Sequence, residues 1–102
     1  MNKKNLIGTF NLNTCPNITE IISKNLDYLI IDREHGSHDF NSTNVLNKII
    51  KKNCMSLIRV SNLNKIEIQR CLDLNPNGIL IPQISSYEDA KFAISCSYFK
   101  PR

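Results

Sequence analysis

Hydrophobic positions along this chain alternate between short continuous runs and stripes with helical spacing. A short apolar run between polar residues is typical of a buried strand, and apolar residues spaced three and four apart are typical of a helix that packs on one face. The runs that predict strands are residues 6–10, 28–32, 55–60 and 78–82. The stripes that predict helices are Ile18, Ile21 and Ile22; Val45, Leu46, Ile49 and Ile50; Ile68, Cys71 and Leu72; and Ala90, Ala93 and Ile94.

Residues that commonly begin helices stand near the predicted start of each helix. The candidates are Pro16 in the first turn of one helix, Ser42 or Thr43 and Asn62 or Asn64 as caps of the next two, and the capping-box pair Ser85 and Glu88 at the last. Two independent patterns therefore predict the same helices.

Strands that alternate with helices predict an α/β fold with a parallel sheet and right-handed crossovers. Two architectures remain open, a small open α/β domain and the first half of an eight-stranded barrel of βα units. No linker or change of composition divides the chain, so we expect residues 1–102 to form a single domain, which as half a barrel would be incomplete. The helices of a half-barrel would cover only its outer face and leave an inner face and two strand edges exposed.

Composition excludes several classes of protein. With 41% hydrophobic and 22% charged residues the chain is typical of a globular domain, and no run reaches the roughly 18 apolar residues of a membrane helix. The apolar segment near the N-terminus is too short for a signal peptide, so we expect a cytoplasmic protein. Its cysteines fit neither a zinc spacing nor a dense disulfide framework, and we expect reduced thiols, mostly in the core. The net charge is +4, but the basic residues are dispersed and form no stripe for nucleic acid.

Candidate chemistry gathers where the predicted strands end. Asp32, Glu34 and His35 follow the second strand, and Arg59 lies near the end of the third. The carboxyl ends of parallel strands meet at one edge, so we expect these side chains to converge. An imidazole beside a carboxylate can act as a general base, and a guanidinium can hold a carboxylate or stabilise an enolate. Together they predict proton abstraction or carbon–carbon bond chemistry on an oxo acid.

The same residues also have non-catalytic interpretations. The polar cluster could be no more than a strand end, and Arg59 could be an edge-strand residue with its head in solvent. We expect His38 to be a solvated loop residue rather than a second catalytic group. No Gly-rich phosphate loop or nucleophile elbow is present. A metal site built from Asp32, Glu34, His35 and Asp39 is hard to complete, because a hard cation generally takes carboxylates from more than one strand.

The same residues resemble the HpcH/HpaI aldolase family, which comprises metal-dependent class II aldolases. The segments that carry the resemblance are residues 8–10, 27–36, 58–60, 66–73, 78–82, 88–90 and 98–102. The most specific combination is the motif Asp32-x-Glu34-His35-Gly followed by Arg59 and then Asp73.

The resemblance implies a lyase that cleaves 2-keto-3-deoxy (4-hydroxy-2-oxo) acids to pyruvate and an aldehyde. It implies that His35 is the base acting on the substrate hydroxyl, that Arg59 stabilises the developing pyruvate enolate, and that Asp73 raises the basicity of His35. Asp32 and Glu34 receive a supporting role. In the family a divalent cation, Mg²⁺, Mn²⁺ or Co²⁺, polarises the pyruvate carbonyl.

The resemblance covers only the N-terminal portion of that family's TIM (β/α)8 barrel. Its metal ligands, a Glu and an Asp, and the Gln that contacts pyruvate lie on later strands, beyond the C-terminus of this chain. We therefore expect that the chain alone binds no metal and has little or no aldolase activity.

Asp73 ends the third predicted helix, which in a barrel faces away from the strand ends that carry His35. We hypothesise that the two residues meet across a subunit interface in a homo-oligomer. An alternative function is a non-catalytic truncated remnant or half-barrel interaction module that pairs with itself or with a complementary chain. A third possibility is a small open α/β binding domain unrelated to aldolases.

Overall fold

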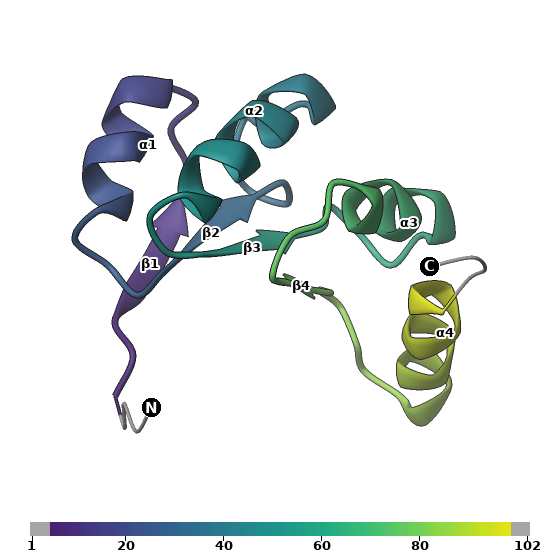
Figure 1. Ribbon diagram of the computed structural model, residues 1–102. Coiled ribbons are helices and arrows are strands. Elements are labelled where there is room, and N and C mark those ends of the chain that lie inside the picture. Colours follow the sequence, from purple (N-terminus) through teal and green to yellow (C-terminus); the bar gives the residue numbers. More distant parts are fainter. Residues whose placement is uncertain (1–4, 99–102) are drawn as a thin grey trace.

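The computed structural model describes residues 5–98 and confirms the predicted α/β class (Figure 1). Its elements are β1 (Gly8–Asn11), α1 (Pro16–Ser23), β2 (Tyr28–Asp32), α2 (Phe40–Lys51), β3 (Met55–Arg59), α3 (Lys65–Asp73), β4 (Gly78–Leu80) and α4 (Tyr87–Ser97). The strands form one parallel sheet in the order β1-β2-β3-β4. Neighbouring strands are consecutive in the sequence and are joined through a helix, which is the arrangement of successive βα units in a barrel.

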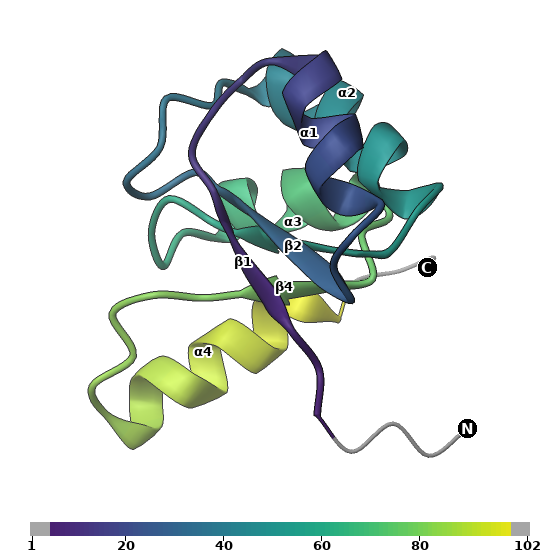
Figure 2. The same cartoon turned by 90° about the vertical axis from the view of Figure 1, so that its left-hand side faces the viewer.

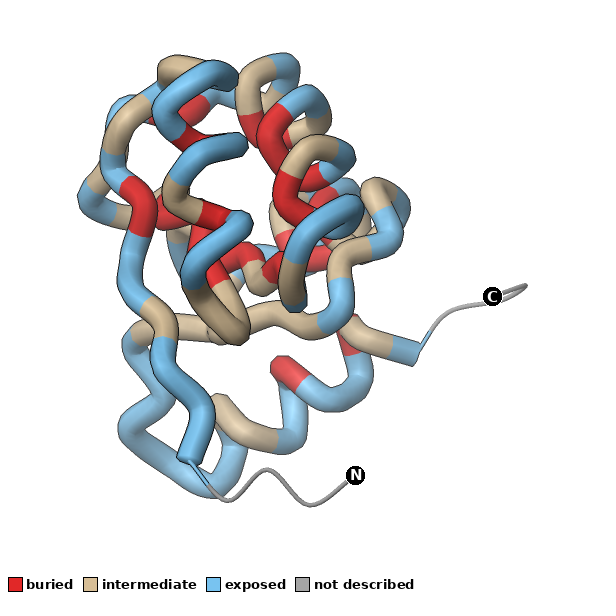
Figure 3. Tube along the Cα trace, turned by 60° about the vertical axis from the view of Figure 1, so that its left-hand side comes forward, coloured by how far each residue is buried: buried red, intermediate tan, exposed pale blue. Residues whose placement is uncertain are grey.

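The hydrophobic core lies between the sheet and its helices. Side chains along a strand alternate between the two faces of a sheet, and the helix-facing Leu29, Ile31 and Ile58 are fully buried. The core cluster is Leu29, Ile31, Leu46, Ile50, Ile58, Val60, Ile68, Cys71 and Cys96. In Figure 3 the buried segments gather where helices and strands meet. Burial of each large apolar side chain contributes roughly 1.5–3 kcal/mol, which is what holds the helices on the sheet.

The opposite face of the sheet is open. Strand register aligns Phe10, Ile30 and Leu57 on this face, where the central Ile30 is buried between its neighbours and the flanking positions are more exposed. Phe10 is 42% exposed and Met55, which lies on the same face, is 38% exposed. Figure 2 shows α1 and α2 together above the sheet and α4 below it, so that the helices follow the sheet around one side. The chain therefore has the form of an incomplete barrel, with an outer face covered by helices and an inner face open to solvent.

In α1 and α4 the buried residues differ from those predicted. In α1, Ile22 packs against the core, but Ile18 and Ile21 are exposed. The residues that α1 buries are Thr19 and Ser23, whose hydroxyls hydrogen-bond to side chains of other elements. The helix packs beside α2 at one edge of the sheet, so part of its apolar stripe finds no neighbour. The same holds at the other edge, where Ile94 of α4 is exposed.

The caps of α2, α3 and α4 are polar residues, as expected, but only the cap of α3 lies at a predicted position. Asn64 caps α3, as one of the two alternatives stated, and accepts a hydrogen bond from the Glu67 N–H. The cap of α2 is Asp39 rather than Ser42 or Thr43, because Phe40 already begins the helix. The capping pair of α4 is shifted by one residue, from Ser85 and Glu88 to Ser86 and Asp89. The first strand is also shifted and begins at Gly8 instead of Leu6.

Two further expectations concern the chain as a whole. All four cysteines are free thiols; Cys71 and Cys96 lie in the core as predicted, and Cys15 and Cys54 are half-buried. Within residues 5–98, none of the helices is sufficiently long and apolar to cross a membrane. The last segment of the family resemblance lies mostly in residues 99–102, outside the described residues.

Candidate active site

Strands β2 and β3 end side by side and bring Asp32 opposite Arg59 in the sheet register. Arg59 Nε donates a hydrogen bond of 3.0 Å to Asp32 Oδ1, and Arg59 Nη2 donates one of 2.7 Å to Asp32 Oδ2. The Asp32 carboxylate is almost fully buried, whereas the Arg59 side chain retains 24% exposure. A forked pair of this kind fixes the guanidinium in both position and plane.

The other hydrogen bonds of Asp32 shape the loop that follows β2. Its Oδ1 accepts the backbone N–H groups of Glu34 at 3.0 Å and of His35 at 3.2 Å. The hydrogen bonds from Arg59, opposed by burial and helped by these two N–H groups, lower the pKa of Asp32 to about 2. Asp32 is therefore ionised throughout the physiological range and serves as a fixed acceptor, not as a proton carrier.

Arg59 is held by three partners and keeps one nitrogen available. Besides Asp32, it stacks over the Phe10 ring at 4.5 Å from the ring centroid, and its Nε lies 3.4 Å from Glu34 Oε1. The hydrogen bonds to Asp32 raise the pKa of Arg59. Within residues 5–98 no hydrogen bond is formed by Nη1, so this group is available to donate to an anion. The interpretation of Arg59 as a solvated edge residue is wrong, because β3 lies inside the sheet and Asp32 holds the head group.

His35 lies at the outer side of this cluster. Its side chain is 68% exposed, and its Nε2 lies 3.6 Å from Glu34 Oε1. Glu34 thus stands between the imidazole and the Arg59 guanidinium. The structure brings together Asp32, Glu34, His35 and Arg59, as the strand-end argument predicted, and leaves the imidazole accessible to a ligand.

Asp73 does not join this cluster within one chain. It is the exposed last residue of α3, a helix that runs back toward the start of the sheet. The next turn of chain confirms the location, since Asn77 N–H donates to the Ser56 carbonyl near the beginning of β3. The expectation that Asp73 lies at the far end of the sheet from His35 therefore agrees with the fold.

His38 was predicted to be solvated, and this is wrong. It is 7% exposed, and its Nε2 lies 2.8 Å from the Asn11 carbonyl oxygen, while Nδ1 has no partner among the described residues. His38 therefore links the loop after β2 to the end of β1. Sequence analysis had no signal for this contact, because the partner is a backbone carbonyl distant in the sequence.

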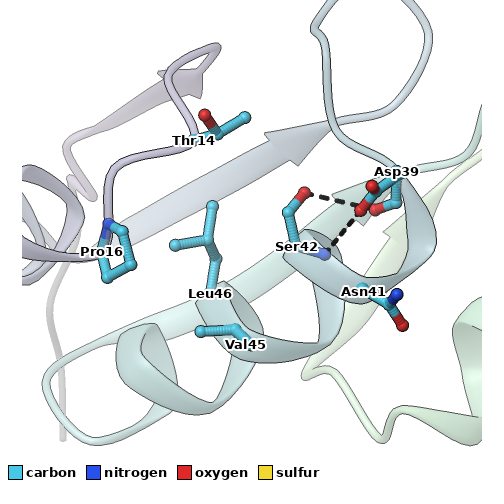
Figure 4. A pocket seen from close by; sticks show the side chains of 7 residues that line it. All are labelled: Thr14, Pro16, Asp39, Asn41, Ser42, Val45 and Leu46. Carbon is cyan, nitrogen blue, oxygen red and sulfur yellow. Dashed lines mark hydrogen bonds between the residues drawn. The ribbon is translucent and has the colours of Figure 1, made fainter.

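A pocket of about 280 Å³ lies between the loop that follows β1 and the first turns of α2 (Figure 4). It is lined by Thr14, Pro16, Asp39, Asn41, Ser42, Val45 and Leu46. Its one charged group, the Asp39 carboxylate, already caps α2 through the Ser42 N–H at 2.7 Å. None of the residues expected to act in catalysis lines this pocket, and we assign it no role.

The described residues do not fit a divalent cation. Residues 5–98 contain no group of three or more His, Cys, Asp or Glu side chains placed to hold a metal ion. Asp32 is occupied by Arg59 and two backbone N–H groups, and Glu34 faces the same guanidinium. The metal that the family resemblance implies would therefore need other ligands.

Comparisons with known proteins find similar sequences among aldolases. No family model matches the chain. It is 29% identical over 98 residues to 5-keto-4-deoxy-D-glucarate aldolase of Escherichia coli (strain K12), covering 93% of this chain and 38% of that protein. It is 27% identical over 89 residues to 4-hydroxy-2-oxovalerate aldolase of Novosphingobium aromaticivorans, covering 84% of this chain and 34% of that protein.

Solved structures show the same relationship. The HpcH/HpaI aldolase from Desulfitobacterium hafniense DCB-2 is similar at 30% identity with a TM-score of 0.81, over 94% of this chain and 38% of that one. The chain resembles part of the HpcH/HpaI aldolases. An HpcH/HpaI aldolase/citrate lyase family protein from Burkholderia cenocepacia J2315 has the same fold, with a TM-score of 0.86 at 22% identity and coverage of 92% and 38%. Four βα units and the covered share are consistent with the N-terminal portion of an HpcH/HpaI barrel.

Proposed function

We propose that this chain supplies the base and the anion-binding arginine of an aldolase that cleaves 4-hydroxy-2-oxo acids, including 2-keto-3-deoxy sugar acids, to pyruvate and an aldehyde. The observation that carries the proposal is the forked Asp32–Arg59 pair with His35 beside it at the strand ends. Several similar proteins are named as aldolases of such acids. Because the chain spans about a third of their length, their activities and substrates are proposals for it.

We propose a separate task for each residue, which the geometry supports. Arg59 Nη1 donates to the substrate carboxylate or to the oxygen that becomes the enolate, where charge increases during the reaction. The exposed His35 imidazole accepts the proton of the substrate hydroxyl. The electron pair of that O–H bond forms the carbonyl of the aldehyde, the adjacent carbon–carbon bond breaks, and its electrons form the pyruvate enolate. Return of a proton to the enolate carbon completes pyruvate.

The site is incomplete in charge as well as in ligands. Asp32 and Glu34 oppose the single positive charge of Arg59, which leaves one net negative charge when His35 is neutral. The net charge therefore opposes an oxo acid anion, and the remaining Arg59 N–H donors are its only attractive contact among these residues. We propose that a divalent cation, Mg²⁺, Mn²⁺ or Co²⁺, acts in the full domain on ligands other than these residues, and that the chain alone has little or no activity.

Asp73 enters this proposal through a second subunit. Its place at the opposite end of the sheet separates it from His35 of the same chain. A contact between the two residues therefore needs a homo-oligomer in which α3 of one subunit approaches the strand ends of another.

Oxalate, a mimic of the pyruvate enolate, tests the anion site directly. Titration of the full chain is expected to shift the backbone amide signals of Glu34 and His35 with an affinity in about the millimolar range, as expected for a weak charge contact. Arg59→Lys should weaken binding severalfold, because lysine cannot hold the fork to Asp32 while donating to the ligand. Lys24→Gln, which removes an exposed cation paired with Glu20 on α1, is the control for non-specific charge effects and should bind as the wild type does. Absence of oxalate-dependent shifts, or equal binding by Arg59→Lys, would overturn the proposed site.

A second candidate function is pairing of half-barrels. Exposed apolar side chains gather at both edges of the structure, with Ile7 and Leu12 flanking β1 and with Tyr87, Phe92 and Ile94 on α4. Unpaired strand edges and exposed apolar patches are typical of surfaces that bind another chain. This candidate needs no catalysis and is consistent with the open inner face.

A further inference from the structure

We propose that the ion pair between Arg33 and Glu67 positions the loop that carries Glu34 and His35 against Arg59. Arg33 lies between two residues of the candidate site but makes its contacts with α3 and α2. Arg33 Nε donates to Glu67 Oε2 at 2.7 Å, and Arg33 Nη2 donates to Glu67 Oε1 at 2.9 Å. Both side chains are only 11% exposed. The pair is thus a forked and largely buried connection between the loop after β2 and α3.

The rest of the Arg33 head group holds the far end of the same loop. Its Nη1 donates to Thr43 Oγ1 at 3.2 Å and contacts the His38 carbonyl oxygen at 3.4 Å. The backbone N–H of Arg33 donates to the Arg59 carbonyl at 2.9 Å. One residue therefore connects the start of the loop, its end and the neighbouring strand.

Glu67 extends the connection to the loop after β3. Its Oε2 also accepts the backbone N–H of Ser61 at 3.1 Å. Burial opposes the charge on Glu67, but the hydrogen bonds from Arg33 and Ser61 outweigh it and lower the pKa of Glu67 to about 2. Phe40 covers the pair, with Arg33 and Arg70 lying 5.9 and 4.1 Å from its ring centroid. The segments that follow Asp32 and Arg59 are therefore joined by one carboxylate.

The Arg33–Glu67 pair affects the geometry of the loop after β2 more than the overall stability of the fold. The desolvation of a buried ion pair offsets much of its attraction, so its net contribution to folding is small, whereas loss of one partner is costly. The pair also lies beside the loops and not in the apolar cluster that holds the helices on the sheet. Arg33 and Glu67 are therefore positioning residues for Glu34 and His35, and their role in ligand binding rests on the proposed function.

Amide hydrogen exchange of the full chain tests the positioning role. In Glu67→Gln, which keeps the shape and removes the charge, the amides of Glu34 and His35 are expected to exchange at least about tenfold faster, because local opening becomes easier. The amide of Ile58 in β3 should change only with global stability. Glu20→Gln, which removes an exposed pair with Lys24, is the matched control and should leave all three amides unchanged. Unchanged exchange at Glu34 and His35, or equal acceleration at all three amides, would overturn the proposal.

A second variant keeps the test decisive if Glu67→Gln does not fold. Arg33→Lys retains the charge without the fork, and it should accelerate the amides of Glu34 and His35 severalfold relative to wild type, while the amide of Ile58 changes only with global stability. Where Glu67→Gln does fold, the double variant Arg33→Lys/Glu67→Gln should show less acceleration than the product of the single effects, since both changes break one interaction. Oxalate binding is the second measurement, and Glu67→Gln should weaken it severalfold. If the wild type binds no oxalate, the proposed function fails, whereas the amide exchange still decides the positioning role.

Discussion

At the scale of single residues, Asp32 determines how the candidate site is built. It accepts two hydrogen bonds from Arg59 and two from the loop, so it orients the guanidinium and sets the position of His35 with one carboxylate. The resemblance implied only a supporting role for it. The geometry explains that role, because a buried carboxylate that accepts four hydrogen bonds and has a pKa of about 2 orients its donors and does not take up a substrate proton.

The lowered pKa of Asp32 predicts an acid-dependent loss of stability. A folded-state pKa of about 2 against an ordinary value of 3.8 means that the unfolded chain binds the proton more readily. The stabilisation from Asp32, about 2 kcal/mol, is therefore present above about pH 4 and is lost as the pH falls toward about 2. In Asp32→Asn this contribution is absent and Arg59 loses its charged partner. We expect this variant to lose about 2–3 kcal/mol of unfolding free energy at neutral pH, with the difference from wild type narrowing in acid. Urea unfolding across the pH range measures this, and a difference that does not vary with pH would contradict it.

At the scale of elements, most helices and strands follow from apolar spacing, but their exact ends do not. The pattern located every strand and helix, whereas the start of α2 depends on which of several polar residues meets a free N–H group. Asp39, Ser42 and Thr43 are all good candidates in the sequence. The structure assigns Asp39 as the cap, while Thr43 is buried against Arg33. Tertiary contacts thus choose among residues with similar local preference.

The cap of α2 gives a prediction at this scale. Asp39→Ala should lower the unfolding free energy by about 1 kcal/mol, the usual effect of losing a side-chain cap. Ser42→Ala removes only a hydroxyl that contacts the Asp39 carbonyl at 3.3 Å, so the loss should be smaller. Urea unfolding midpoints of the two variants make the comparison. A larger loss in Ser42→Ala would show that the sequence-predicted cap is the one that matters.

At the scale of the whole molecule, the sheet is open where a barrel would be closed. Its inner face exposes Phe10 and Met55, and α1 and α4 expose Ile18, Ile21 and Ile94. A parallel sheet is normally buried on both faces, so this structure has apolar surface that favours association.

Mass and activity, measured on one preparation of the full chain, form the prediction for the whole molecule. If half-barrels pair, light scattering should show a discrete oligomer, and Phe92→Lys on the exposed face of α4 should shift it toward monomer. A monomeric wild type would exclude self-pairing.

Pyruvate release from a 2-keto-3-deoxy acid with Mg²⁺ or Mn²⁺ should be little or none. Pyruvate release that His35→Ala abolishes would contradict the expected inactivity and would support the aldolase assignment.

The sequence by itself determined the order of βα units, the side of the sheet on which polar groups converge, and the meeting of Asp32, Glu34, His35 and Arg59. Those features depend on local spacing and on the common direction of parallel strands, which a sequence pattern reports. Only the tertiary structure decided that His38 is buried against Asn11, that Arg33 pairs with Glu67, and that part of the stripe in α1 stays exposed. These depend on contacts between residues far apart in the chain, and on neighbours absent from the described fold, so no local pattern records them.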